Sequence, residues 1–195
     1  YISSGTWSLM GVETPEPIIT EDSLASNFTN EGGVCGTFRF LKNIMGLWLV
    51  QECRRTWAQA GEDLSYADLT QRAAVAAPFA SILEPDSHDF FSPGDMPARI
   101  RQFCQRTGQS QPETKGEIIR CALESLALKY RWVLDKLELI LGYSLDTIHI
   151  VGGGSQNGLL CQLAADSTQR SVIAGPVEAT AAGNVLMQAL ARGQI

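Results

Sequence analysis

Two short stretches rich in glycine and hydroxyl side chains have the composition of phosphate-holding turns. Gly152, Gly153 and Gly154 follow the apolar run at 147–151 and precede a predicted helix. Glycines at such a turn let the backbone approach a ligand closely, and helix N-terminal amides favour phosphate. The stretch SSGTWS at 3–8 can present hydroxyls and backbone amides as a concave nest. Each also has a structural explanation: an empty tight turn for the first, and an ordinary hairpin, the commoner use, for the second.

The glycine turn does not complete a dinucleotide-binding fingerprint. Counting G-x-G-x-x-G from Gly152 places Asn157 where the third glycine belongs. No acidic residue ends the next predicted strand, at 171–174, to hold a ribose hydroxyl. A classical dinucleotide site is therefore excluded, while a different nucleotide site remains open.

Two amide side chains stand eight residues apart at the start of a predicted helix. Asn43 and Gln51 would lie about 12 Å apart along the helix axis. Amides can donate to and accept from sugar hydroxyls or a nucleotide. The structural alternative is that Asn43 caps the helix and Gln51 is a solvated polar residue.

Metal and nucleophile chemistry find little support. His88 and His149 are the only histidines, and no cysteine, histidine and carboxylate spacing fits a metal site. We expect His149 in the core of its strand and His88 in solvent. No G-x-S-x-G elbow is present. The small side chains of 179–184 are typical of a helix packed closely on a sheet.

Composition excludes several classes of partner. The chain has 195 residues and a formal net charge of −6, without a basic stripe, which argues against nucleic acid and anionic membrane. No apolar run reaches the roughly 20 residues of a membrane span. Five cysteines without a C-x-x-C pair predict reduced thiols in a cytoplasm. Cys104 and Cys121 are placed to meet, but we expect no disulfide.

The elements that must position these residues change character along the chain. The amino-terminal part predicts an antiparallel meander: strands around a turn at Gly5, a turn at 29–33 and a strand at 36–40. An irregular surface loop is expected at 78–96. Strand, glycine turn, helix, strand and helix then predict an α/β unit with parallel strands at 147–151 and 171–174. Helices are expected at 43–60, 64–77, 97–106, 114–141, 158–168 and 178–192.

In this order the motifs resemble the carboxy-terminal domain of the FGGY carbohydrate kinases, two-lobed enzymes of the actin-like ATPase class. The resemblance rests on SSGTWSLMG, TNEGG, LKNIMGLW, HIVGGGSQN and AGPVEAT, and it covers essentially the whole chain. It implies an α/β, ribonuclease H-like fold with a mixed sheet flanked by helices. Residues 1–195 would be the nucleotide-binding domain, and the sugar-binding amino-terminal lobe would lie outside this chain.

The resemblance also implies a reaction. The sequences of these motifs resemble those of the family members that transfer the γ-phosphate of ATP, with Mg²⁺, to the 1-hydroxyl of L-rhamnulose in the cytoplasm. Matching positions imply the following roles: Thr6 for the phosphate-side contact, Gln51 for a nucleotide contact, Gly152, Gly153 and Gly154 for the adenosine-side turn, Asn157 for the adenine pocket and Asn43 for a sugar contact.

No catalytic residue is expected within the chain. The resemblance places the general-base aspartate upstream of Tyr1, and Glu13, Asp22 and Glu31 are expected to be solvated or turn residues. The fragment alone is therefore expected to be inactive. Three alternatives stay open: a kinase for another deoxyketose such as L-fuculose, a non-catalytic actin-like nucleotide-binding module, and a purely structural domain with empty turns.

Overall fold

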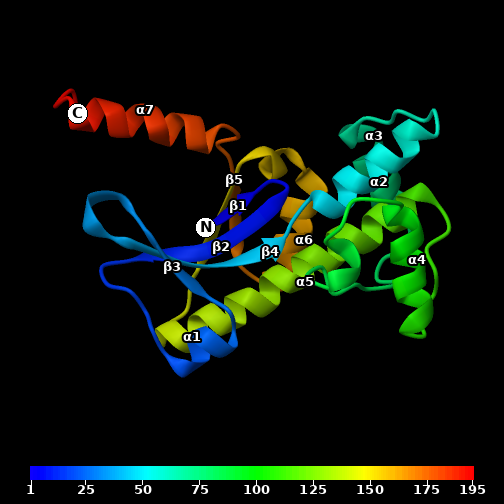
Figure 1. Ribbon diagram of the computed structural model, residues 1–195, viewed down its shortest axis with the longest axis horizontal. Helices are drawn as coiled ribbons and strands as arrows, with labels where there is room; N and C mark the ends of the chain where they lie inside the picture. The colour runs from blue at the N-terminus through cyan, green and yellow to red at the C-terminus, as the bar shows by residue number, and fades with distance from the viewer.

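The computed structural model describes residues 1–195 and is built around one mixed sheet of six strands (Figure 1). Its strand order is β3-β4-β2-β1-β5-β6. The first four strands pair antiparallel, whereas β5 runs parallel to β1 and to β6. The sequence predicted this mixed arrangement. The strands are β1 (Ile2–Ser4), β2 (Trp7–Thr14), β3 (Thr29–Gly32), β4 (Phe38–Met45), β5 (Thr147–Val151) and β6 (Ser171–Ala174).

Seven α-helices accompany the sheet, and α5 (Lys115–Leu141) runs beneath it (Figure 1). Thr114 and Glu117 form the expected capping box at its start. Gly142 ends it in the left-handed conformation, at φ 76°. The other helices are α1 (Glu21–Ala25), α2 (Trp48–Gln59), α3 (Tyr66–Val75), α4 (Met96–Arg106), α6 (Gly158–Thr168) and α7 (Ala179–Ala191).

The core lies between one face of the sheet and α5. Alternate residues of β1 and β2, such as Ile2 and Met10, are buried there. Tyr130, in the middle of α5, is fully buried under β2. Every second residue of these strands and one apolar face of α5 point toward each other, so the buried side chains form one continuous layer between the sheet and the helix.

The opposite face of β5 is open, which corrects the expectation for His149. Ile148 and Ile150 are buried, whereas His149 between them is exposed. Successive side chains of a strand point to opposite faces, so only every second residue reaches the core. The apolar run had suggested burial on both faces.

The region before α2 also differs from the prediction. Asn43 lies in β4 rather than in a helix, and α2 begins only at Trp48. A Cβ on Gly46 would lie 2.6 Å from the Trp7 backbone, so a glycine is required where the chain passes close to β2 before the helix starts. The expected turn at 29–33 is instead strand β3, and the turn follows at 33–37, where Gly36 has φ 81°.

The long connection at 78–96 is irregular, as predicted, but it is not confined to the surface. Leu83 and Phe90 are buried. The Leu83 amide donates to the Ser125 hydroxyl of α5 at 2.8 Å. The connection therefore covers part of the core.

Cys104 and Cys121 are both buried, and both are free thiols.

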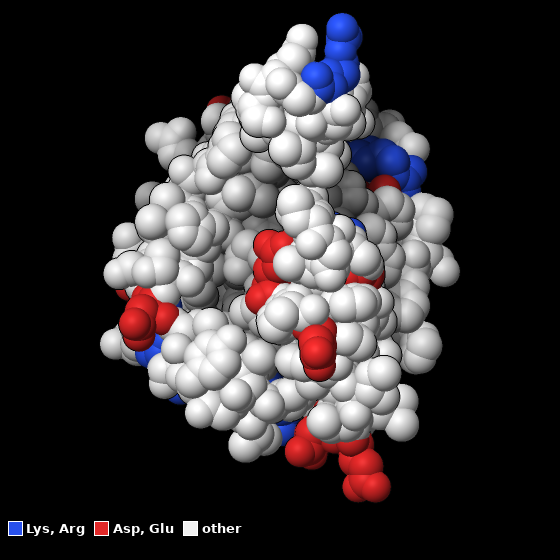
Figure 2. All heavy atoms as spheres, turned by 90° about the vertical axis from the view of Figure 1, so that its left-hand side faces the viewer, with Lys and Arg blue, Asp and Glu red and all other residues white.

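Helix α7 does not pack on the sheet as its small residues suggested. None of its residues is buried, and Figure 1 shows it standing away from the body. Val185 and Leu186 are more than half exposed. In Figure 2 the protruding top of the molecule is formed mainly by uncharged side chains, and acidic side chains gather lower down. No helix is both long and apolar enough to cross a membrane.

Candidate functional site

A pocket of about 860 Å³ lies where four separate segments meet. Its size falls within the roughly 300–1,000 Å³ of small-molecule sites. The segments are the β1–β2 turn, the start of α2, one face of α3 and the turn that follows β5. The lining residues are Gly5, Leu47, Val50, Gln51, Tyr66, Ala67, Thr70, Gln71, Ala74, Gly153, Gly154, Gln156, Asn157, Gly158 and Leu159.

The three glycines of the turn after β5 have different surroundings. A Cβ on Gly154 would lie 2.0 Å from Ser4 Oγ, and one on Gly152 would lie 2.8 Å from the Ser4 carbonyl oxygen. Gly152 also has φ 84°, in the left-handed region. A Cβ on Gly153 would meet nothing within 4 Å. Two glycines are therefore required by close packing on β1, and Gly153 is the one that leaves open space at the pocket.

The hairpin turn of SSGTWS is joined to the start of α2. The amides of Leu47 and Trp48 donate to the carbonyl oxygens of Gly5 and Thr6, at 2.9 and 3.1 Å. The Thr6 hydroxyl donates to Gln51 Oε1 at 3.0 Å. The carbonyls of the hairpin thus satisfy amides that a helix start leaves unpaired. The sequence placed Thr6 and Gln51 in one site from distant motifs, and the fold brings them together.

Asn157 closes the pocket from the other side. It is the N-cap of α6, and its Oδ1 accepts from the Leu160 amide at 3.0 Å. Its Nδ2 donates to the Thr70 hydroxyl of α3 at 3.3 Å. One amide therefore caps a helix and links the glycine turn to α3.

The pocket carries no charged side chain. Its polar groups are amides, hydroxyls and backbone atoms, which suit a ligand held by directed hydrogen bonds.

Beneath the hairpin the Tyr130 hydroxyl lies 2.7 Å from the Ser8 hydroxyl, and burial raises the pKa of Tyr130 to about 12. The tyrosine therefore stays neutral and serves as a fixed hydrogen-bond partner below the site.

Comparison with known proteins decides the family. The model of the C-terminal domain of the FGGY family of carbohydrate kinases matches residues 1–192. The chain belongs to this family. The motif-based resemblance to this family is thereby confirmed.

Among FGGY relatives, rhamnulokinases align along the whole chain. Identity is 51% with the Bacteroides thetaiotaomicron enzyme and 45% with that of Halalkalibacterium halodurans; all of this chain is covered, with 39% and 41% of the relatives. The Bacillus subtilis rhamnulokinase is 43% identical, again over all of this chain and 40% of its own length. The chain thus spans about two fifths of these relatives.

Solved structures confirm the fold. A xylulose kinase from Lactobacillus acidophilus superposes with a TM-score of 0.67 at 14% identity, covering 100% of this chain and 38% of that one. A xylulose kinase from Rhodospirillum rubrum gives 0.63 at 20% identity, covering 90% and 35%. These neighbours are FGGY sugar kinases, so the actin-like ATPase fold expected from the motifs is confirmed.

The predicted site residues fall into three groups within this FGGY domain. Gln51, Gly153, Gly154 and Asn157 line the pocket, and Thr6 is bonded to Gln51 at its edge. Gly152 lies behind the turn, against Ser4. Asn43 is not among the lining residues: it is exposed on β4, opposite Leu9 of β2. Its predicted sugar contact stays a prediction.

Sequence reasoning missed the α3 wall of the pocket. The residues that form this wall recur at helical spacing on a face of α3 different from that of the buried Leu69 and Ala73; they are Tyr66, Ala67, Thr70, Gln71 and Ala74. That periodicity was readable, but a polar face of a helix normally faces solvent. Only the fold shows that the glycine turn stands across from it.

The family resemblance implies two small partners, a nucleotide and Mg²⁺. The pocket volume, the open space at Gly153 and the uncharged polar lining fit a nucleotide. No group of three or more histidine, cysteine or carboxylate side chains is placed to hold a metal ion.

Proposed function

We propose that this chain is the nucleotide-binding lobe of an ATP-dependent sugar kinase that phosphorylates the 1-hydroxyl of L-rhamnulose. The observation that carries the substrate is the identity of 43–51% with rhamnulokinases from three bacteria, continuous along the chain. Because the chain covers only about two fifths of those proteins, the rest of the enzyme would supply most of the sugar site. The other partner of this lobe would be the amino-terminal lobe.

The pocket supports a division of labour for the nucleotide. The adenosine would lie between the glycine turn at Gly153 and the α3 wall, with Asn157 at the base. Phosphates would extend toward the hairpin, where Thr6 and Gln51 lie 3.0 Å apart. Fixing donor and acceptor in line is the main contribution a protein makes to phosphoryl transfer.

Deprotonation of the sugar hydroxyl is assigned to the missing part of the protein. No Asp, Glu, His or Lys lines the pocket, so it offers no carboxylate to act as the general base. We therefore propose that the isolated chain binds nucleotide but does not phosphorylate a sugar. Mg²⁺ would enter with the nucleotide and be held by its phosphates and by residues outside this chain.

The odd number of cysteines, without a C-x-x-C pair, supports a cytoplasmic location.

The test is an ATP-consumption assay on the full-length protein with L-rhamnulose, L-fuculose and D-xylulose. The proposal expects the highest kcat/KM with L-rhamnulose. A preference for L-fuculose would reassign the substrate, and ADP binding without turnover of any sugar would support a non-catalytic module. No binding of ADP at all would support the alternative of a purely structural domain with empty turns.

A matched pair of variants connects the assay to the hairpin. Thr6→Ala removes the hydroxyl that meets Gln51, whereas Thr6→Ser keeps it. The proposal expects a higher KM for ATP in Thr6→Ala and a value near wild type in Thr6→Ser. Equal values in the two variants would remove the hydroxyl from the site.

A further inference from the structure

Helix α3 is a wall of the nucleotide pocket, and it is fixed from behind by α5. Leu69 and Ala73 face the core and are fully buried. A Cβ on Gly116 of α5 would lie 2.6 Å from the Arg72 carbonyl oxygen, so the two backbones approach closely there. Ala74 faces the pocket itself. A shift of α3 against α5 would therefore change the width of the pocket.

The carboxyl end of α3 is bound by one arginine of α5. Arg120 Nη1 donates to the carbonyl oxygens of Ala73 and Ala74, at 3.2 and 3.1 Å. The last carbonyls of a helix lack partners within it, and a positive charge near them also opposes the negative end of the helix dipole. Since Ala74 lines the pocket and also accepts from Arg120, this contact reaches the wall directly.

Arg120 is in turn held by a buried carboxylate. Glu124 is 1% exposed; its Oε1 accepts from Arg120 Nε at 2.6 Å, and its Oε2 accepts from the Phe79 amide at 2.8 Å. Phe79 has φ 53°, a left-handed conformation that is unusual for a bulky residue. Glu124 thereby fixes both the arginine and the chain just after α3.

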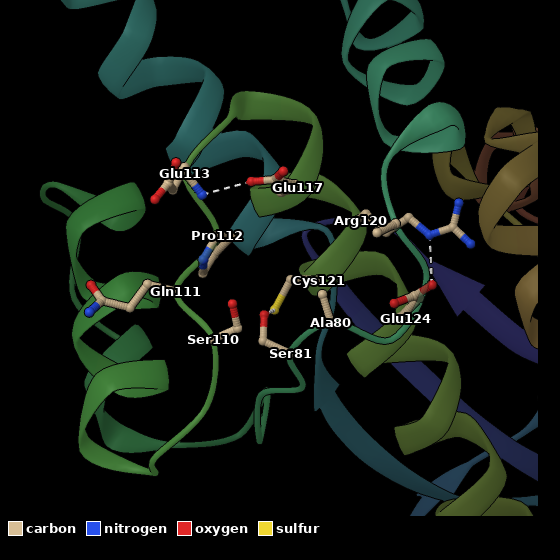
Figure 3. A pocket seen from close by; sticks show the side chains of 11 residues that line it. Ala80, Ser81, Ser110, Gln111, Pro112, Glu113, Glu117, Arg120, Cys121 and Glu124 are labelled. Carbon is tan, nitrogen blue, oxygen red and sulfur yellow. Dashed lines mark hydrogen bonds and ion pairs between the residues drawn. The ribbon is translucent and has the colours of Figure 1, made fainter.

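Figure 3 shows Arg120 and Glu124 side by side on α5, at a second, smaller pocket of about 290 Å³. The glutamate oxygens are already engaged, so this small pocket has no free carboxylate at Glu124 for a ligand. The arrangement matches a clamp rather than a binding site.

We infer that Arg120, oriented by Glu124, is a positioning residue for the nucleotide pocket. It sets the place of the second half of α3 and hence the separation between α3 and the glycine turn. A lysine reproduces this only in part: its three donors share one nitrogen, whereas the planar guanidinium presents Nε to the carboxylate and Nη1 to the two carbonyls. The inference rests on the proposed function, since it assigns the pocket to a nucleotide.

The test uses the full-length protein with Arg120→Gln, Arg120→Lys and Glu124→Gln. The control is Arg131→Gln, which removes another (i, i+4) ion pair of α5, Arg131 Nε to Asp135 Oδ1 at 2.8 Å. We expect Arg120→Gln to raise the ADP Kd and the ATP KM about tenfold, which corresponds to roughly 1.4 kcal/mol. The KM for the sugar should stay near wild type, Arg120→Lys should recover only part of the affinity, and the control should match wild type.

Hydrogen exchange separates this inference from the proposed function. Amides of α3 should exchange faster in Arg120→Gln and in the milder Glu124→Gln, and not in Arg131→Gln. Unchanged exchange in α3, or a lower Tm with unchanged ADP Kd and ATP KM, would overturn the positioning role. If wild type itself binds no ADP, the proposed function fails, and the exchange data still decide whether Arg120 positions α3.

Discussion

The hydroxyl oxygens of Ser8 and Tyr130 lie 2.7 Å apart, although 122 residues separate them in the chain. Ser8 ends the SSGTWS hairpin, and Tyr130 is the largest fully buried side chain, in the middle of α5. This one contact joins the SSGTWS hairpin to the helix that supports the sheet. The hairpin is therefore seated on the core and does not hang free at the edge of the pocket.

Removing one of the two hydroxyls should destabilise the fold. Tyr130→Phe leaves the Ser8 hydroxyl buried without its partner, and we expect a loss of about 1–3 kcal/mol in the free energy of unfolding. Ser8→Ala should cost a similar amount, and the double variant should cost less than the sum. Urea denaturation measures all three. Strict additivity would show that the two hydroxyls do not act as a pair.

The same pair predicts a loss of stability at high pH. Burial raises the pKa of Tyr130 to about 12, above the ordinary value of about 10. The folded state then binds the proton more tightly than the unfolded state, so this contribution is complete below about pH 10 and is lost toward pH 12. The stability difference between wild type and Tyr130→Phe should therefore shrink from about pH 8 to about pH 11. Tyr143→Phe, at an exposed tyrosine, is the control.

The glycine turn should separate folding from binding. Gly154→Ala places a Cβ 2.0 Å from Ser4 Oγ, so we expect a destabilisation of about 1–3 kcal/mol. Gly153→Val has open space around its Cβ in the free protein and should keep the wild-type Tm. It should nevertheless weaken ADP binding, measured by calorimetry, because the side chain enters the space assigned to the nucleotide. Wild-type affinity in Gly153→Val would place the nucleotide elsewhere.

Asn157 should show which part of its amide matters for each task. Asn157→Asp keeps an oxygen for the Leu160 amide but loses the donor to Thr70. It should therefore retain the helix cap, whereas Asn157→Ala should lose about 1 kcal/mol of stability. Both should bind ADP more weakly in a titration. An Asp variant with normal affinity would restrict Asn157 to capping.

Helix α7 should be dispensable for the stability of this chain. It contributes no buried residue, so deleting the chain after Val177 should change the unfolding free energy by less than about 1 kcal/mol. Pro176 must be retained, because its carbonyl accepts from the Gly152 amide at 3.1 Å. A loss of several kcal/mol in thermal or urea unfolding would show that α7 packs on the domain in solution.

Local patterns determined the elements whose signals lie within a few residues. The capping box at Thr114, the stripe of α5 and its glycine stop predicted that helix because each is a short-range interaction. The strand at 147–151, its glycine turn and α6 were predicted for the same reason. The motifs around Thr6, Gln51 and Gly153 also sufficed to indicate the family.

Tertiary structure decided whatever depends on a distant partner. Asn43 lies in β4 because β2 offers eight residues to pair with, a long-range contact that outweighs local helix periodicity. His149 is exposed because nothing covers that face of β5, and α7 stands free because its apolar side meets no partner in this chain. The α3 wall and its Arg120 clamp exist only once α5 brings α3 opposite the glycine turn. Burial and pairing are properties of surfaces that meet in space, and one-dimensional periodicity shows only which residues are able to meet.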